Sequence, residues 1–118
     1  MLKLKRNEGG SWLALASGED ASPYVKLANG VILQAVDDYR KALAYIVEKE
    51  KWLESEDGAQ ASPKQRDRVQ RKIVSSWKTV REIEQFFRSG RCRIFTELDM
   101  VVIGKRIRAE FPDIELYE

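Results

Sequence analysis

Residues 27–53 read LANGVILQAVDDYRKALAYIVEKEKWL, and their periodicity predicts one long amphipathic helix. Apolar side chains recur at steps of three, four or seven residues, at Ile32, Val36, Tyr39, Leu43, Ile46 and Leu53. These steps trace one face of a helix, which turns once in about 3.6 residues, whereas a strand repeats every two. A helix of this span is about 40 Å long. We therefore expect the rest of the chain to pack onto it.

A second helical pattern follows a polar linker at residues 54–62, ESEDGAQAS, which Gly58 interrupts. Ser62-Pro63 is typical of a helix start, because serine caps free N–H groups and proline at the first position loses no hydrogen bond. The pattern runs to Gly90, with apolar residues at Val69, Ile73, Trp77, Val80, Ile83 and Phe87. The short linker predicts that the two long helices pack antiparallel.

The C-terminal part predicts a third, shorter helix from Leu98 to Glu110. Thr96 and Asp99, in TELD, resemble a capping box. The first turns are apolar nearly all round, so we expect them to be well buried. Pro112 ends the helix, and the acidic tail DIELYE is expected on the surface.

The N-terminal residues 1–21 predict either an arm or a short hairpin, because Leu2 and Leu4 alternate with lysines before the turn signal Gly9-Gly10. Residues 22–118 are expected to form a single helical domain. The predicted fold class is therefore all-α: two long antiparallel helices with a shorter apolar third helix.

Composition narrows the function classes. The chain has 118 residues, one cysteine and no histidine. No run of about 18 apolar residues is present, so we expect no membrane span. The single cysteine favours the reducing cytoplasm. Without histidine, the commonest general base and metal ligand is missing, so we expect no catalytic residues, no cofactor, no metal and no enzymatic activity.

Charge is concentrated in one segment. Residues 60–93 contain ten basic and three acidic residues, a net charge of +7 in a chain whose total is +2. This segment predicts a nucleic-acid-binding surface that contacts phosphates. The alternative is a solvated helix face whose charges pair with the acidic first helix. The candidate binding residues are Lys64, Arg66, Arg68, Arg71, Lys72, Arg88, Arg91 and Arg93.

The DDYR sequence at residues 37–40 is better explained by packing than by catalysis. Adjacent helical residues diverge by about 100°, so Asp37 and Asp38 do not face each other. Tyr39 lies on the apolar face, with its hydroxyl expected at the core edge. We expect interhelical ion pairs in which Asp37 or Asp38 meets Arg81 or Arg88, and Arg40 meets Glu82 or Glu84. The residues assigned to this network are Asp38, Arg40, Glu82, Glu84 and Arg88.

Cys92 lies in sequence among Arg88, Arg91 and Arg93. Nearby cations lower a thiol pKa, which would make it reactive. The alternative is an ordinary small apolar residue.

Three blocks of the sequence occur in the order VILQAVDDYRKAL, EIEQFFRS and TELD. In this order they resemble a family of small uncharacterised proteins of bacteriophages, prophages and mobile elements of Gram-positive bacteria. Arg91-Cys92 stands where that family has Trp-Phe, and Met100 where it has Gly. The resemblance covers about residues 28–108. It implies a genomic setting and no activity. The matching residues are Ile32, Leu33, Gln34, Asp38, Tyr39 and Arg40, then Glu82, Ile83, Glu84, Phe86, Phe87, Arg88 and Ser89, then Thr96, Leu98 and Asp99.

Three hypotheses follow. The first is a non-enzymatic accessory or regulatory protein of a phage or mobile element that acts through protein–protein contacts. The second is a nucleic-acid-binding protein that uses residues 64–93. The third, ranked last, is an enzyme. A homodimer is also expected, because long helices around a small core leave apolar surface at their ends.

Overall fold

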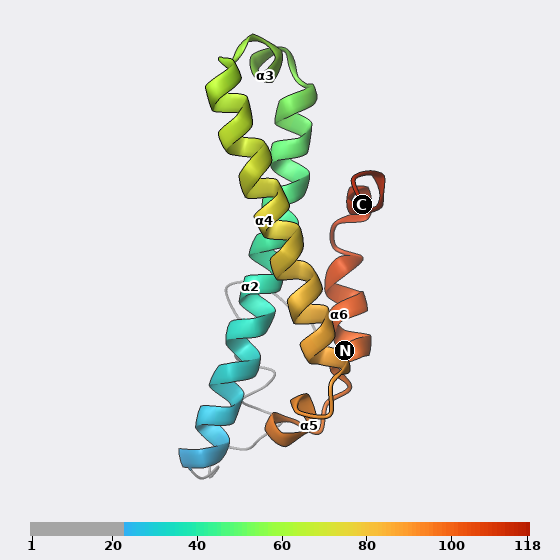
Figure 1. Ribbon diagram of the computed structural model, residues 1–118. Helices are drawn as coiled ribbons and strands as arrows, with labels where there is room; N and C mark the ends of the chain where they lie inside the picture. Colours follow the sequence, from blue (N-terminus) through green and yellow to red (C-terminus); the bar gives the residue numbers. More distant parts are fainter. Residues whose placement is uncertain (1–22) are drawn as a thin grey trace.

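The computed structural model describes the backbone of residues 23–118 and the side chains from residue 30 onward. The predicted arm or hairpin at residues 1–21 lies outside these residues. The described part is helical and contains no strand, which confirms the all-α class (Figure 1). Its elements in chain order are α2 (Pro23–Glu54), α3 (Glu56–Gln60), α4 (Pro63–Arg88), α5 (Cys92–Phe95), α6 (Met100–Arg108) and the 3₁₀ helix η2 (Pro112–Leu116).

Helix α2 is the 32-residue element around which the others are arranged. Its expected apolar face is buried as far as Ile46, and Leu53 is only half-buried. The buried positions follow steps of four and three residues, as in a coiled coil, and therefore form one continuous seam. They are Ile32, Val36, Tyr39, Leu43 and Ile46, none more than 2% exposed.

Helix α4 runs antiparallel to α2, as predicted (Figure 1). It begins at the expected Ser62-Pro63, where the Ser62 hydroxyl accepts a hydrogen bond from the backbone N–H of Gln65 at 3.1 Å. Its buried residues Ile73, Val80 and Phe87 are spaced by seven. Seven residues are close to two turns, so these side chains point together into the seam with α2.

The linker between the two long helices is more ordered than the sequence predicted, because it contains α3. The Ser55 hydroxyl caps α3 by accepting from Gly58 N at 3.2 Å. Arg66 of α4 donates to the carbonyl oxygens of Leu53 at 3.2 Å and Gly58 at 2.6 Å. A Cβ at position 58 would lie 1.9 Å from the carbonyl oxygen of Trp52. The turn therefore requires glycine there.

Helix α6 is the third helix of the core, but its start differs from the prediction. Asp99, not Thr96, is the N-cap: its carboxylate accepts from the N–H groups of Val101 and Val102 at 3.1 and 3.3 Å. Thr96 instead accepts from Leu98 N at 3.1 Å, in the connection. The all-round burial expected for the first turns is also wrong, because Val102 is 44% exposed. One face of α6 is buried and the other meets solvent.

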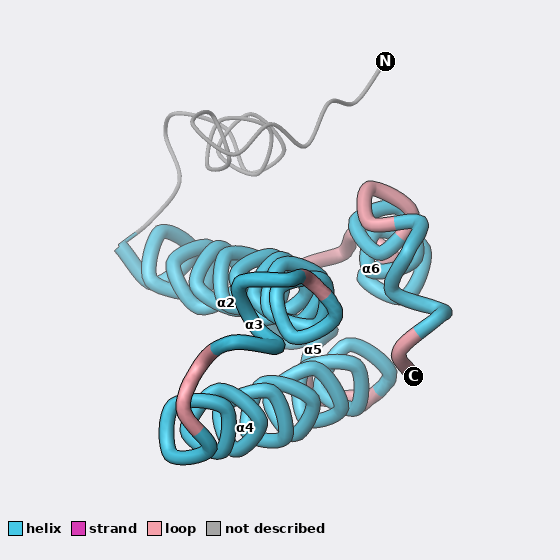
Figure 2. The backbone as a smooth tube through the Cα atoms, turned by 90° about the horizontal axis from the view of Figure 1, so that it is seen from above, coloured by secondary structure: helices cyan, strands magenta, loops and turns pink. Residues whose placement is uncertain are grey.

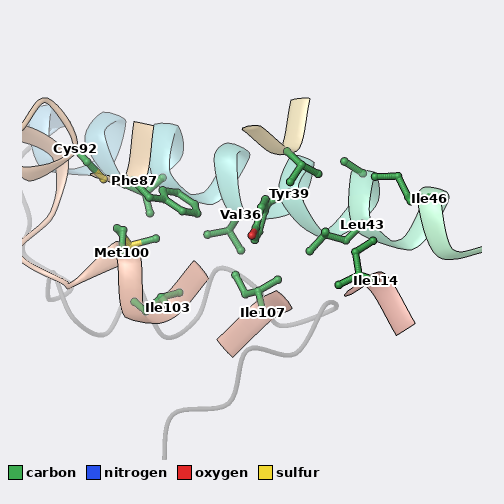
Figure 3. Packing of buried hydrophobic residues seen from close by; sticks show 13 residues of the cluster. Val36, Tyr39, Leu43, Ile46, Phe87, Cys92, Met100, Ile103, Ile107 and Ile114 are labelled. Atoms are coloured by element: carbon green, nitrogen blue, oxygen red, sulfur yellow. The ribbon is translucent and has the colours of Figure 1, made fainter. Parts of the chain in front are cut away.

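The core lies where α2, α4 and α6 face one another (Figure 2). Met100, Ile103 and Ile107 form a row on α6 that faces the buried row of α2 (Figure 3). Ile114 continues this row beyond the end of α6 (Figure 3). The connection between α4 and α6 contributes Cys92, from the short helix α5.

The acidic tail was expected on the surface, and most of it is there, but Ile114 is an exception. Ile114 is 1% exposed, and Lys51 of α2 pairs with Asp113 at 2.6 Å. The tail therefore packs against α2 through Ile114 and this ion pair, and Tyr117 also lies against the core. No signal in the sequence indicated the burial of Ile114, because the tail also contains the acidic residues Asp113, Glu115 and Glu118.

The molecule is elongated, with extents of 55 × 26 × 22 Å. The tip of the α2–α4 hairpin extends past the C-terminal segment (Figure 1). In this projecting part the apolar residues Trp52, Leu53 and Val69 are only half-buried. Among the described residues, no helix carries an apolar stretch that would cross a membrane.

We expect Ile114→Ala to lower the free energy of unfolding by about 2–4 kcal/mol, because a buried side chain leaves a cavity. The matched control Leu116→Ala should change it by less than about 0.5 kcal/mol, since Leu116 is 76% exposed. Urea denaturation of both variants measures the difference. Equal midpoints for the two variants would mean that the tail is not part of the core.

Candidate functional site

Two adjoining hollows lie along α4, one against α6 and the other against the C-terminal residues, and together we call them the α4–α6 groove. The two hollows measure about 230 and 250 Å³ and share Glu84. A third hollow, of about 340 Å³, adjoins the groove at the α5 end. The first hollow is lined by Tyr39, Phe87, Arg88, Val101, Gly104, Lys105 and Arg108. The second is lined by Val74, Trp77, Val80, Arg81, Tyr117 and Glu118.

Glu84 joins three helices at the floor of the groove. Its Oε2 accepts a hydrogen bond from the Tyr39 hydroxyl at 2.6 Å and one from Arg108 Nη1 at 2.8 Å. Burial, together with the Glu84 carboxylate, raises the pKa of Tyr39 above its ordinary value. Tyr39 therefore stays neutral and acts as a donor. Its hydroxyl lies at the core edge, as the helical pattern indicated.

Arg108 connects this floor to the C-terminal segment. Besides Glu84, it pairs with Glu115 at 3.1 Å and with Glu118. Its guanidinium also lies 6.0 Å from the centre of the Trp77 ring. Burial alone would lower the pKa of Arg108, but the surrounding carboxylates raise it above the ordinary arginine value. Its charge is therefore neutralised locally by acidic partners.

The two walls of the groove come close because α6 has a glycine at the contact. A Cβ at Gly104 would lie 3.1 Å from the Phe87 ring. That ring in turn packs edge-on against Tyr39, with centroids 5.8 Å apart. The small residue thus lets α6 approach α4, which sets the width of the first hollow.

The rims carry three exposed cations, Arg81 and Arg88 on α4 and Lys105 on α6. Within residues 30–118, none of these three side chains forms an ion pair. In the second hollow, the lining residue Val74 is 66% exposed. The groove therefore combines apolar walls with positive rims.

The ion pairs differ from those predicted between α2 and α4. Arg40 is 4% exposed and makes a bidentate contact with Glu110, at 3.1 and 2.8 Å, rather than pairing with Glu82 or Glu84. Glu84 pairs with Arg108. Asp38 accepts from Gln34, one turn earlier, instead of meeting an arginine of α4. Asp37 likewise pairs within α2, with Lys41 at 2.7 Å.

Two residues of that expected network, Glu82 and Arg88, are exposed on α4. The end of α6 and the turn after it supply the ion-pair partners instead. Arg108 pairs with Glu84 of α4, and Glu110 pairs with Arg40 of α2. The residues expected to pair across the hairpin are therefore joined through α6 and the turn after it.

The candidate nucleic-acid residues fall into two groups, one on the projecting part of α4 and one at its other end and around α5. Lys64 to Lys72 lie at the hairpin tip, and Arg88 lies about 24 Å further along α4 by helical rise. Arg66 is engaged with backbone carbonyls, and Arg71 pairs with Asp67 at 3.0 Å. Lys72 lies 4.8 Å from the centre of the Tyr45 ring. Arg91 and Arg93 flank the short helix α5 and are exposed.

Cys92 is a small apolar residue of the core, which was the alternative to a reactive thiol. It is 3% exposed, and burial raises the pKa of its thiol. The neighbouring arginines do not activate it, since the side chain points into the core (Figure 3). Within residues 30–118, no group of three acidic or cysteine side chains is placed to hold a metal ion.

Comparison of the chain with protein-family models, curated proteins and solved structures gives no match. The groove must therefore be interpreted from its own residues. Sequence reasoning missed Arg81, Lys105 and Arg108 as site residues. The available signal was the spacing of Val101, Gly104, Lys105 and Arg108, which places them on one face of a helix.

We expect Tyr39→Phe to lower the free energy of unfolding at neutral pH by about 0.5–1.5 kcal/mol, because one hydrogen bond is lost. Its folded pKa is raised, so ionisation in the unfolded chain, near about pH 10, favours unfolding. The wild-type protein should therefore keep the full contribution of this group to its free energy of unfolding below that pH. Above that pH, its free energy of unfolding should fall more steeply than that of the variant. Urea titrations at neutral and alkaline pH measure this. An unchanged alkaline slope in the variant would contradict it.

Proposed function

We propose that this chain is a non-enzymatic accessory protein that acts by binding another protein through the α4–α6 groove. The observation that carries the proposal is the groove itself: apolar walls, an exposed Val74 in the second hollow, and exposed cations on both rims. Exposed apolar surface beside polar rims is typical of protein-interaction sites.

The dimensions favour a macromolecule over a small ligand. The hollows measure about 230 and 250 Å³, below the range of about 300–1,000 Å³ usual for pockets that enclose small molecules. They follow one another along α4 and share Glu84 at their boundary. An extended partner surface would use both, whereas a small ligand would fill only one.

The chemistry of the groove floor supports a non-enzymatic role. A general acid or base works best with a pKa near the working pH. Tyr39 and Arg108 have pKa values raised further from neutrality, and both are bound to Glu84. We infer that this cluster holds helices together rather than exchanging protons.

We also propose a phage, prophage or mobile-element setting, on the resemblance of the three sequence blocks. Residues of those blocks have structural roles here: Tyr39, Glu84 and Phe87 line the groove, and Asp99 caps α6. Proteins that share them would share this helix packing. A cytoplasmic location is proposed because the single Cys92 is a buried thiol, which suits a reducing compartment.

The test is site-specific photo-crosslinking in the cells that carry the gene. A photoreactive residue at Lys105 or Arg81 should give a cross-linked protein adduct, whereas one at Glu48, on the exposed side of α2, should not. Val74→Asp should remove the adduct. The matched control Val31→Asp, at an exposed valine of α2, should keep it. Absence of any groove-specific adduct from the folded protein would refute the proposal.

A second candidate, nucleic-acid binding, is favoured by the exposed Lys64, Arg68, Arg71 and Lys72 on the projecting part of α4. Its test is binding to mixed-sequence single- and double-stranded DNA at two salt concentrations. Affinity should fall steeply with salt, because each neutralised phosphate releases counterions. Charge reversal at Arg68, Arg71 and Lys72 should weaken binding and flatten the salt slope. No binding at low salt would exclude this candidate.

A further inference from the structure

We propose that the partner of the α4–α6 groove is an acidic amphipathic helix. Its apolar face would enter the two hollows, and its carboxylates would meet Arg81, Arg88 and Lys105. This inference rests on the proposed function and specifies the chemistry of the partner.

The length of the groove fits a helix. From Val74 to Arg88 the wall spans about 21 Å of α4, which a helix of about 14 residues matches. Trp77, which lines the second hollow, and Phe87, which lines the first, are about 15 Å apart along α4. On a partner helix, residues eleven positions apart are separated by about 16.5 Å and return to the same face. Two large apolar side chains at this spacing would fill both hollows.

The exposed cations of the rims favour a partner with negative charge. Arg108 is already surrounded by Glu84, Glu115 and Glu118, so it offers little attraction to a ligand. Arg81, Arg88 and Lys105 are exposed and form no ion pair within residues 30–118. A basic helix would place like charges against them, whereas acidic side chains would complement them and speed the encounter.

Nucleic acid fits the groove less well than a helix. Phosphates would satisfy the three rim cations but would leave the apolar walls beside Trp77 and Phe87 without a partner. A helix supplies both kinds of contact at once. The groove is therefore assigned to a protein ligand, with DNA as a competitor in the test.

The experiment is selection from a displayed library of helix-forming peptides of about 18 residues, against the intact protein. Enriched peptides should carry two large apolar residues at the stated spacing and aspartate or glutamate on the flanks. The triple variant Arg81→Glu, Arg88→Glu, Lys105→Glu should bind the selected acidic peptides about tenfold to a hundredfold more weakly. Selection against that variant should enrich lysine and arginine instead.

The matched control is Lys64→Glu, Arg68→Glu, Lys72→Glu, which removes the same charge from residues that do not line the groove. It should retain acidic-peptide binding within about twofold. Equal losses in both variants, or enrichment without acidic residues, would overturn the inference. The proposed function would still stand if Val74→Asp abolished that binding. Two results together would overturn the inference and assign the rims to nucleic acid. DNA would have to displace the peptides, and it would have to fail to bind the variant with the substitutions Arg81→Glu, Arg88→Glu and Lys105→Glu.

Discussion

The carboxylate of Glu84 holds three helices in register. One of its oxygens accepts from Tyr39 of α2 and from Arg108 of α6, while the residue itself belongs to α4. Charge-assisted hydrogen bonds of this kind are the stronger ones, and loss of any member would leave a partly buried polar group unpaired. The same arrangement fixes Arg108 where it reaches the C-terminal segment. This contact holds α6 beside α2 and α4, and the small Gly104 then lets α6 come close to Phe87.

The long elements could be predicted from sequence because their signals are repeated many times. The buried seam of α2 and the heptad spacing of Ile73, Val80 and Phe87 in α4 each report the same face, so single exceptions do not matter. Ion-pair partners could not be predicted in this way. If only α2 and α4 are considered, Arg40 and Glu84 are the expected partners. When α6 packs beside them, Glu110 and Arg108 take those places.

Predictions that rested on only one or two residues failed for a related reason. TELD has two residues that can cap a helix, and the choice of Asp99 over Thr96 depends on where α6 docks. Ile114 shares a short acidic tail with Leu116 and Tyr117, and so short a stretch has no periodicity to reveal which apolar residue is buried. The candidate site was missed because its rims come from α4 and α6, which are separate in sequence. Only the helical spacing around Lys105 hinted that a charged side chain shares a face with Val101 and Gly104.

The projecting hairpin also affects how the protein behaves in solution. A compact chain of about 100 residues has a radius of gyration of about 13 Å, whereas the described part of this chain has one of 16.7 Å. Such a rod-like particle meets more friction than a sphere of equal mass and tumbles faster about its long axis than across it. It would elute from a sizing column ahead of a spherical 13.6 kDa standard. An apparent mass well above that of one chain is therefore the expected behaviour of a monomer. Association has to be judged from light scattering or sedimentation equilibrium, which measure mass independently of shape.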